Sequence, residues 1–397
     1  MKKKLLFIIP GLSAGGGERS LINLLSHIDY TKYDVDLFLL SHEGIFMGLL
    51  PANVRVLPLP NNYRQFALPL WLSVSKFIAK GKINLAYNRF MFSLQNRMDS
   101  SIGIREQNSW KHVANAMNII DSQYDAAIGF LEKTSIYFCV DKVNATKKIG
   151  WVHNDYDKLE MDPNFDLNYF ENLDNIITVS DECANVLVNR FPNQEKKVKV
   201  IYNIVSPGII HKLANEVTTD VYHRNGDEII ILSIGRLHTQ KGFELAIMAC
   251  KKLLQLGYNI RWNVIGEGDE RDRLTTIIKQ EGLDQHFILL GLMTNPYPYL
   301  KQADIYAQTS RYEGKAIAID EAKILSKPIV VTNFSTARDQ IVDGVEGLIV
   351  EMNADSVAAG IGKLIQNADF SRKMKDHLSC LHLGTEEEIN KLYKLLC

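Results

Sequence analysis

The chain has 397 residues, too many for one ordinary hydrophobic core, which predicts two domains. A hydrophobic share of 46%, a charged share of 23% and a net charge of -1 exclude a disordered chain and give no general attraction to nucleic acid. The five cysteines form no Cys-x-x-Cys pair, which argues against a disulfide framework or a zinc site and fits a reducing compartment.

The amino-terminal apolar run is short. Leu5 to Ile9 gives five apolar residues before Pro10, whereas a secretory signal needs about 7–15. No stretch approaches the roughly 20 apolar residues of a membrane span. We therefore expect a cytoplasmic protein.

Apolar runs of strand length alternate with helical patterns along most of the chain, which predicts doubly wound parallel sheets. The helical patterns include Glu18 to Ser26 and Phe243 to Leu256. The first series of expected strands is 4–10, 34–40, 125–131, 147–153, 175–180 and 199–203, and the second is 229–235, 260–266, 286–291, 304–310, 328–333 and 347–351.

The two series are separated by residues 204–228, whose Pro207, Gly208 and polar cluster are typical of a linker. We predict a Rossmann-like domain at 1–205, a second at 206–375, and a carboxyl-terminal helical segment at 376–397. Ligands bind outside the carboxyl ends of strands in such sheets, so two facing sheets would share one central cleft.

Residues 61–117 interrupt the alternation, with no clear strand. They hold eight Lys or Arg residues against two acids, Asp99 and Glu106, together with many aromatic side chains. Leu70, Val74, Phe77 and Ile78 have helical spacing. A basic amphipathic helix of this kind suits an anionic membrane surface. The alternative is an ordinary helix that packs on the first domain with its lysines in water.

A glycine-rich loop follows the first strand and opens a helix. Gly15, Gly16 and Gly17 would let backbone N–H groups approach an anionic ligand. The pattern is not G-x-G-x-x-G, so it gives a nicotinamide cofactor little support. A tight turn without a ligand is the alternative.

The first loop of the second half, "SIGRLHTQKG", places Arg236 and Lys241 within five residues of each other after Gly235. Two cations at the carboxyl end of a strand suit a diphosphate. The alternative is two solvated loop cations. Gly266 and Gly291 mark two further strand ends in the same half.

Other candidate residues lie in the first half. The "DVD" at 34–36 precedes its strand, and the "DYD" at 155–157 has no third acid nearby, so neither predicts a metal site. His153 ends a strand, where it would face the cleft, or it is a structural histidine.

The stretch "RYEGKAIAIDEAKILSKPIVV" carries Glu313 in a loop and Glu321 in a helix that we expect to begin near Lys315 or Ala316. The N–H groups of that helix would face a phosphate, and the carboxylates would accept hydrogen bonds from hydroxyls on either side of it. The alternative is two solvated glutamates flanking a packing helix.

The ordered set "GRLHTQKG", "GEGDERDRL", "LGLMTNPYPYL", "YEGKAIAIDEAKILSKPIVVTN" and "DGVEGLIV" resembles glycosyltransferase family 4, a group of retaining transferases with the GT-B fold. The resemblance is dense over 229–351, and the glycine loop and His153 extend it to the first half. It implies an α/β fold of two Rossmann-like domains, with the acceptor domain first and the nucleotide-sugar domain second. It also implies that the carboxyl-terminal helix within 376–397 crosses back to the first domain.

The resemblance also implies residue roles. Glu313 would touch the donor sugar, with His153 near it, and Glu321 would bind the ribose. Arg236 and Lys241 would neutralise the leaving diphosphate. Backbone groups of Gly314, Lys315, Ala316 and Ile317 would reach the sugar and phosphate. Neither a metal ion nor another cofactor is implied, and no protein nucleophile.

Two departures affect the donor sugar. Lys315 and Ala316 stand where the family often has an aromatic residue and Pro or Gly, and Ser335-Thr336 to Asp339 replaces Gly-Gly to Glu. We predict a transferase that uses a nucleotide sugar, UDP-linked, and a saccharide or polyprenyl-diphosphate-linked acceptor in polysaccharide assembly at the inner face of the cell membrane. The alternatives are a nucleotide-sugar epimerase of the same fold and a non-catalytic membrane-docked binding protein.

Overall fold

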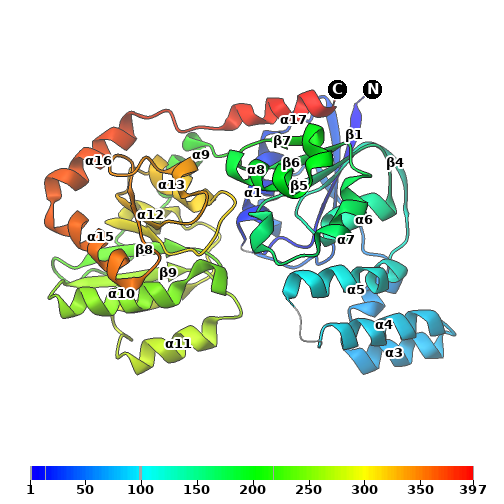
Figure 1. Ribbon diagram of the computed structural model, residues 1–397, viewed down its shortest axis with the longest axis horizontal. Helices are drawn as coiled ribbons and strands as arrows, with labels where there is room; N and C mark the ends of the chain where they lie inside the picture. The colour runs from blue at the N-terminus through cyan, green and yellow to red at the C-terminus, as the bar shows by residue number, and fades with distance from the viewer. Residues whose placement is uncertain (1, 14, 98–100, 218, 397) are drawn as a thin grey trace. The chain divides into compact units, whose positions relative to one another are not determined.

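The computed structural model describes residues 2–13, 15–97, 101–217 and 219–396, and the chain divides into two compact units (Figure 1). Asp99, one of the two acids counted in the basic segment, lies outside the described residues. Unit 1 comprises Met1–Ser13, Leu24–Tyr202 and Ile389–Cys397, and unit 2 comprises Ala14–Asn23 and Asn203–Glu388.

Unit 1 is built on a parallel sheet of seven strands in the order β3-β2-β1-β4-β5-β6-β7. β1 lies between β2 and β4, with Leu5 paired with Val35 on one side and with Ala126 on the other. Its residues Leu5 to Ile9 are fully buried, as expected for a strand covered on both faces. The strands are β1 (Lys3–Ile9), β2 (Tyr33–Leu39), β3 (Val54–Val56), β4 (Ile120–Gly129), β5 (Val143–Val152), β6 (Asn175–Thr178) and β7 (Val198–Val200).

The helices of unit 1 cover this sheet and extend beyond it. α3 packs on α4, α4 on α5 and α5 on α6, so the segment between β3 and β4 forms a helical stack beside the sheet (Figure 1). These helices are α2 (Asn61–Phe66), α3 (Leu70–Ala79), α4 (Ile83–Gln95), α5 (Ile102–Ala116), α6 (Thr134–Lys142), α7 (Pro163–Phe170), α8 (Asp181–Arg190) and α17 (Ile389–Leu396).

Unit 2 is built on a second parallel sheet, of six strands in the order β10-β9-β8-β11-β12-β13. Alternate residues of one strand enter different cores: Ile231 of β8 packs in one cluster, and Ile230 and Leu232 pack in another. The sheet therefore has helices on both faces. The strands are β8 (Ile229–Ile234), β9 (Ile260–Ile265), β10 (Phe287–Gly291), β11 (Ile305–Gln308), β12 (Ile329–Thr332) and β13 (Leu348–Val350).

Two further sets of elements complete the chain. The helices of unit 2 are α9 (Pro207–Ala214), α10 (Phe243–Gln255), α11 (Arg271–Gln280), α12 (Tyr297–Gln302), α13 (Ile317–Ile324), α14 (Ala337–Gln340), α15 (Ala354–Gln366) and α16 (Ala368–Cys380), and α1 (Gly16–His27) has residues in both units. Short 3-10 turns are η1 (Met47–Leu49), η2 (Tyr156–Lys158), η3 (Pro192–Lys197), η4 (Thr239–Lys241) and η5 (Glu386–Glu388).

The existence of the expected strands is confirmed, since each of the twelve expected segments overlaps a strand of one of the two sheets, although β4 and β5 begin several residues earlier than expected. The sequence missed β3, which has only three residues, none of them buried, and so carries no apolar run. The described part of 61–117 contains helices and no strand, as predicted. The expected linker at 204–228 is partly wrong, because α9 lies within it and packs on α12.

The domain limits of the structure differ from those we predicted. The division by contacts falls between Tyr202 and Asn203, rather than at 205/206. The limit at 375/376 falls inside α16, and the last helix begins at Ile389, rather than at 376. That helix packs in unit 1, where the Tyr393 ring stacks on Tyr33 at 5.1 Å. The cleft expected between the domains stays a prediction.

No helix among the described residues combines the length and the hydrophobicity needed to cross a bilayer.

Candidate functional site

Four of the predicted site segments lie at one edge of the unit 2 sheet. Gly235 follows β8, Gly266 follows β9, Gly291 ends β10, and Glu313 lies five residues beyond β11. Because the strands are parallel, their carboxyl ends meet at the same edge, where ligands of such sheets bind. The fold thus brings together residues spread over about 80 positions of sequence.

Glu313 is a buried carboxylate that is held by one of its two oxygens. It is 5% exposed, and its Oε1 accepts hydrogen bonds from Lys241 Nζ at 2.5 Å, Gln308 Nε2 at 2.8 Å and Ser310 Oγ at 2.5 Å. Within the described residues, no hydrogen bond reaches its Oε2. Since a carboxylate offers about four acceptor positions, Oε2 remains able to accept from a ligand hydroxyl.

Glu321 occupies the second turn of α13 and is 4% exposed. Its Oε1 accepts a hydrogen bond from Tyr297 Oη at 2.8 Å and lies 4.0 Å from Arg19 Nε. Burial raises the pKa of the Glu321 carboxyl above its ordinary value, and the Arg19 charge and the Tyr297 hydrogen bond oppose that rise. Such a buried acceptor suits the recognition of ligand hydroxyls.

The start of α13 is fixed by Gln340. The Ala316 N–H donates to Gln340 Oε1 at 2.9 Å, and Gln340 Nε2 donates to the Ala316 carbonyl at 3.0 Å. The helix begins at Ile317, close to the predicted start. The Ala316 amide, which we expected to reach a ligand, already has this partner. The Lys315 carbonyl accepts a hydrogen bond from Asn203 Nδ2 at 3.3 Å.

The two predicted cations are both paired with carboxylates. Lys241 bonds to Glu313, and Arg236 Nη2 lies 3.2 Å from Glu18 Oε1. The Arg236 side chain is 51% exposed, whereas that of Lys241 is 18% exposed. Arg236 therefore presents guanidinium N–H groups to the surface of unit 2, while Lys241 is held beside Glu313.

The glycine loop and the helix after it belong in part to unit 2, and they contribute Glu18 to the surroundings of Arg236. Residues up to Asn23 group with unit 2, and a Cβ on Gly15 would lie 1.9 Å from Glu18 Oε2 and 2.7 Å from Arg236 Nη2. A side chain at Gly15 would thus disrupt the Glu18–Arg236 pair. A Cβ on Gly16 would meet nothing within 4 Å, so packing gives no reason for glycine there. Gly17 lies in the first turn of α1.

Gly266 and Gly291 allow close packing of strand-end loops. The Gly266 N–H donates to the Gly291 carbonyl at 2.9 Å, and a Cβ on Gly266 would fall 1.9 Å from the Gly235 carbonyl oxygen. Gly291 has a φ of +81°, which favours glycine. These contacts explain the glycines structurally, and their contact with a donor stays a prediction. Gly314, between Glu313 and Lys315, likewise stays a predicted donor contact.

His153 follows β5 in unit 1 and is 8% exposed. Its backbone N–H donates to Glu132 Oε2 at 3.0 Å, and its ring packs 4.7 Å from that of Phe130. Burial lowers the pKa of the imidazole to about 4, so the ring is neutral at pH 7. Its buried Nε2 has no hydrogen-bond partner among the described residues, and a group of this kind calls for a ligand or water.

Acidic residues of both D-x-D motifs form hydrogen bonds within unit 1, and the expectation that neither motif binds a metal stays a prediction. Asp36 accepts hydrogen bonds from Arg55 and from Tyr124, and Asp155 caps η2 through the Asp157 N–H. In the part of the chain that the structure describes, no group of three or more His, Cys, Asp or Glu side chains is placed to hold a metal ion.

Sequence reasoning named Lys241 as a site residue but missed the other side chains that hold the two glutamates. Gln308 and Ser310 have the period of two that places strand residues on one face, which was an available signal. Tyr297 stands in "NPYPYL" and Arg19 in the glycine-loop helix, and neither position carries a local sign that it will meet Glu321. Gln340, which holds the start of α13, is 24 residues from Ala316, and its position in the sequence gives no sign of this contact.

Three comparisons with known proteins bear on this geometry. Residues 216–377, within unit 2, match the family model described as glycosyl transferases group 1. An uncharacterized glycosyltransferase of Methanocaldococcus jannaschii is 28% identical over 50% of this chain and 51% of its own length. A Campylobacter jejuni protein named N-acetylgalactosamine-N,N'-diacetylbacillosaminyl-diphospho-undecaprenol 4-alpha-N-acetylgalactosaminyltransferase is 28% identical over 48% of this chain and 50% of its own. The chain spans about half the length of these curated relatives.

Among solved structures, Anabaena Alr3699/HepE in complex with UDP and glucose superimposes with a TM-score of 0.69 at 16% identity, over 99% of each chain. At this identity the likeness shows the fold, which is GT-B, with two parallel-sheet α/β units.

Proposed function

We propose that this chain is a glycosyltransferase that moves a sugar from a nucleotide-diphospho sugar, UDP-linked, to a saccharide or lipid-linked saccharide. The observation that carries the proposal is the pair of buried glutamates, Glu313 and Glu321, placed on either side of the α13 amino terminus inside the region that matches group 1 transferases. The UDP and glucose bound by the Anabaena protein and the diphospho-undecaprenol in the name of the Campylobacter relative support the substrate classes.

In this proposal the two carboxylates divide the donor between them. Glu321 accepts from the ribose hydroxyls, and Glu313 accepts from hydroxyls of the sugar through Oε2. Lys241 already lies beside Glu313, so a diphosphate that reaches Lys241 brings its sugar next to Oε2. Arg236, with half of its side chain exposed, supplies the second cation to the diphosphate.

The reaction proposed is a displacement with retention. The bond from the anomeric carbon to the diphosphate breaks as the acceptor oxygen bonds to that carbon on the same face. The acceptor proton passes to the leaving phosphate oxygen. Arg236 and Lys241 stabilise the charge that develops on the diphosphate, so neither a metal ion nor a protein nucleophile takes part. A contact of the neutral His153 ring with the donor sugar rests on the family resemblance alone.

The proposal places the enzyme peripherally on an anionic membrane, at the inner face of the cell membrane, in capsule, exopolysaccharide or O-antigen assembly. α4 supports this, because Ile83, Tyr87, Phe90 and Leu94 follow the spacing i, i+4, i+7, i+11 and are 62%, 58%, 45% and 47% exposed. They form one apolar stripe that faces away from the core of unit 1. Residues 61–97 hold six Lys or Arg residues and no acid, as suits anionic lipid.

The test is a donor panel incubated with wild-type protein and a bacterial membrane lipid extract. We expect release of UDP from one donor only when the extract is present, transfer of its sugar to a lipid-extractable product, retention of the anomeric configuration by NMR, and no loss of rate in EDTA. Glu321→Gln should lower the acceptor-dependent release, because it weakens binding of the donor ribose. Isomerisation of a donor without extract would support an epimerase instead, and donor binding without turnover would support the non-catalytic binding protein.

A further inference from the structure

Glu313 is held in unit 2 by donors that converge on one of its two oxygens. Oε1 accepts from one cation, Lys241, and from two neutral donors, Gln308 and Ser310. In the part of the chain that the structure describes, Oε2 accepts no hydrogen bond. Because three donors exceed the lone pairs of one carboxylate oxygen, Oε1 is fully used and Oε2 is the side left to a ligand.

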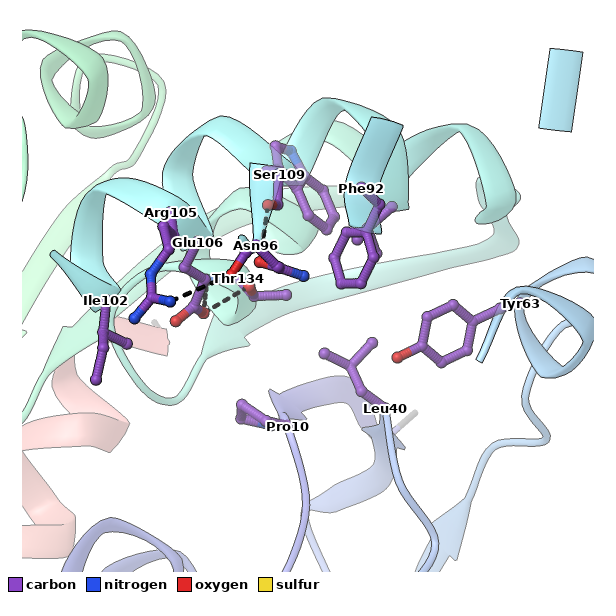
Figure 2. A pocket seen from close by; sticks show the side chains of 12 residues that line it. Pro10, Leu40, Tyr63, Phe92, Asn96, Ile102, Arg105, Glu106, Ser109 and Thr134 are labelled. Atoms are coloured by element: carbon purple, nitrogen blue, oxygen red, sulfur yellow. Dashed lines mark hydrogen bonds between the residues drawn. The ribbon is translucent and has the colours of Figure 1, made fainter. Parts of the chain in front are cut away.

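Glu106 in unit 1 is a carboxylate held in a different way. It lines a pocket beside Thr134, whose Oγ1 donates to Glu106 Oε1 at 2.7 Å (Figure 2), and Lys133 Nζ lies 3.4 Å from Glu106 Oε2. Both oxygens of Glu106 thus have a partner in the same unit. The one-sided arrangement of Glu313 is therefore not required to satisfy a carboxylate in this chain.

Gln308, the last residue of β11, approaches Glu313 from the end of the strand and is 4% exposed. Its Nε2 donates to Glu313 Oε1 at 2.8 Å and to Ser310 Oγ at 3.0 Å. Ser310 Oγ in turn donates to the same Glu313 oxygen at 2.5 Å. Because donors prefer the plane of a carboxylate, these two fix that plane, and with it the direction of Oε2.

The hydroxyl of Tyr306 fixes which end of the Gln308 amide faces Glu313. Tyr306 lies two residues before Gln308 on the same face of β11, is fully buried, and donates to Gln308 Oε1. Burial, together with the charges of Glu321 and Glu313, raises the pKa of the Tyr306 phenol well above its ordinary value, so the hydroxyl keeps its proton. A reversed amide would turn its oxygen toward the carboxylate, to which an oxygen cannot donate.

The backbone between β11 and Glu313 is fixed as well. Thr332 Oγ1 donates to the Ser310 carbonyl at 2.6 Å, and Thr336 Oγ1 donates to the Glu313 carbonyl at 3.0 Å. Both threonines are buried. With the chain held by these hydroxyls, the direction of Glu313 Oε2 depends on the side chains that hold Oε1.

The neutral donors matter most when a nucleotide sugar is bound. In the proposed function Lys241 also contacts the diphosphate, so its charge is shared between the phosphate and Glu313. Gln308 and Ser310 are buried, and both donate to Glu313 without the help of a charge. They can therefore keep Oε1 in place while Lys241 turns toward the phosphate.

We propose that Gln308, oriented by Tyr306, is a positioning residue that aims Glu313 Oε2 at one hydroxyl of the donor sugar and so decides which hydroxyl the enzyme requires. This inference rests on the proposed function. A carboxylate held in one plane accepts well from one direction, whereas a carboxylate that is free to turn accepts from several. Loss of the Gln308 amide should therefore relax the choice of sugar more than it weakens binding of the nucleotide.

The test measures Kd values of the full chain by calorimetry. The ligands are UDP, the tightest binder among UDP-glucose, UDP-galactose, UDP-N-acetylglucosamine and UDP-N-acetylgalactosamine, and analogues of that donor that each lack one sugar hydroxyl. In wild type, removal of one particular hydroxyl should weaken binding about tenfold or more, as expected for a hydrogen bond to a charged group. We call this ratio of Kd values the hydroxyl preference.

The main variant is the double substitution Tyr306→Phe/Gln308→Leu. It removes both polar partners together, so neither is left buried without a hydrogen bond. The hydroxyl preference should fall about threefold or more, while the Kd for UDP stays within twofold of wild type. The control Tyr222→Phe removes another buried tyrosine hydroxyl of unit 2, which donates to the Tyr299 carbonyl at 2.8 Å, and should keep the wild-type preference.

The proposal is overturned if the double variant keeps the wild-type hydroxyl preference while Glu313→Gln loses it, and the assignment of Glu313 to the sugar then still stands. If Glu313→Gln also keeps the preference, that assignment fails, and the positioning role of Gln308 fails with it. A purely structural role for Gln308 would lower the Tm of the double variant without changing the preference.

Should the double variant lose UDP binding as well, it has misfolded, and Tyr306→Phe decides. This single variant keeps the Gln308 amide but leaves it free to turn over. A lower hydroxyl preference in Tyr306→Phe supports the proposal, and an unchanged preference overturns it.

Discussion

The surroundings of the two glutamates in unit 2 and those of the α3–α4 helices in unit 1 are built on opposite principles. Glu313 and Glu321 are buried charges, each with partners in the same unit. In α3 and α4 one face is buried and the other exposes apolar side chains, and eight of the fifteen large hydrophobic residues exposed in the described chain lie between Trp71 and Ile102. The first region is arranged for a small ligand before it binds. The second has a surface that its own unit leaves uncovered.

The largest effect should come from the buried charge that touches the donor sugar. Glu313→Gln keeps the shape of the side chain but removes the charge that holds Lys241 and accepts from the sugar. We expect sugar transfer to fall at least about 100-fold, the range found when one transition-state contact is removed. The measurement is the initial rate of acceptor-dependent UDP release.

Its matched control is Asp369→Asn, which removes an exposed carboxylate that pairs with Arg372 on α16. That variant should keep the wild-type rate. A Glu313→Gln rate within tenfold of wild type would contradict the assignment of Glu313 and remove the contrast between the two regions.

The next largest effect is on the pH dependence of stability, and it comes from the buried His153 of unit 1. His153 has a pKa of about 4 when folded, below the ordinary 6.5, so folding favours its neutral form. This contribution to the free energy of unfolding is complete above pH 6.5 and is lost as the pH falls toward 4, a loss on the order of 2 to 3 kcal/mol between pH 7.5 and pH 4.5. Urea unfolding at the two pH values should show this loss in wild type and not in His153→Gln.

Other groups also titrate in this range. The measurement is therefore the difference between wild type and His153→Gln in the free energy of unfolding that each loses on acidification. His377→Gln, at an exposed position on α16, should lose as much stability on acidification as wild type. An equal loss in His153→Gln would show that the His153 ring is not the buried neutral group described here.

The exposed stripe of α4 gives a smaller effect, on binding to vesicles. Replacing Ile83, Phe90 and Leu94 by glutamine should lower partition to phosphatidylglycerol vesicles at least tenfold, because it removes the apolar area that would enter the interface. Wild-type binding should weaken with salt, since the cations near the stripe are screened. Co-sedimentation with vesicles measures both.

Leu256→Gln is the control, since Leu256 is 70% exposed but lies in unit 2, outside the stripe. The membrane proposal fails if wild type binds anionic and neutral vesicles equally, or if the triple variant binds as wild type does. It also fails if the wild-type protein sediments as a dimer that the triple variant converts to a monomer.

The smallest effect concerns a partner of Glu321. Tyr297→Phe removes the hydroxyl that donates to Glu321 and helps to hold the pKa of this carboxyl down, so that pKa should rise further. Because the ionised carboxylate accepts from the ribose, UDP affinity should fall about threefold to fivefold, the cost of one hydrogen bond. The loss should be greatest on the acid side of the pH profile. A pH profile of UDP affinity identical to wild type would show that Tyr297 does not set the state of Glu321.

The sequence predicted the pieces whose signals are local. The strands appeared as apolar runs, and Glu313 and Glu321 stood out as charges in an apolar stretch next to a strand end. The side chains that hold these glutamates are distant in sequence: Lys241 is 72 residues from Glu313, and Tyr297 is 24 from Glu321. Such pairs are created by the sheet order, which no single stretch of sequence encodes.

The same limit explains the other differences. We did not predict α9, because we interpreted Pro207 and Gly208 as residues that interrupt a helix. In the structure Pro207 lies in the first turn of α9, a position that proline favours. The apolar face expected at 70–78, for which membrane contact and packing were both open, is divided in the structure: Phe77 is fully buried and Ile78 is 54% exposed. The helical pattern predicts that a face is apolar, and only the packing of the neighbouring helix decides whether that face is covered.

The central proposal is that Glu321 binds the ribose of the donor and Glu313 binds its sugar. Calorimetry with UDP and with the UDP-sugar found in the donor panel tests this directly. Glu321→Gln should weaken binding of both ligands by a similar factor, because both carry the ribose. Glu313→Gln should weaken the UDP-sugar and leave UDP within twofold of wild type. If Glu313→Gln weakens UDP as much as it weakens the UDP-sugar, or if Glu321→Gln leaves both unchanged, the assignment of the two carboxylates is wrong.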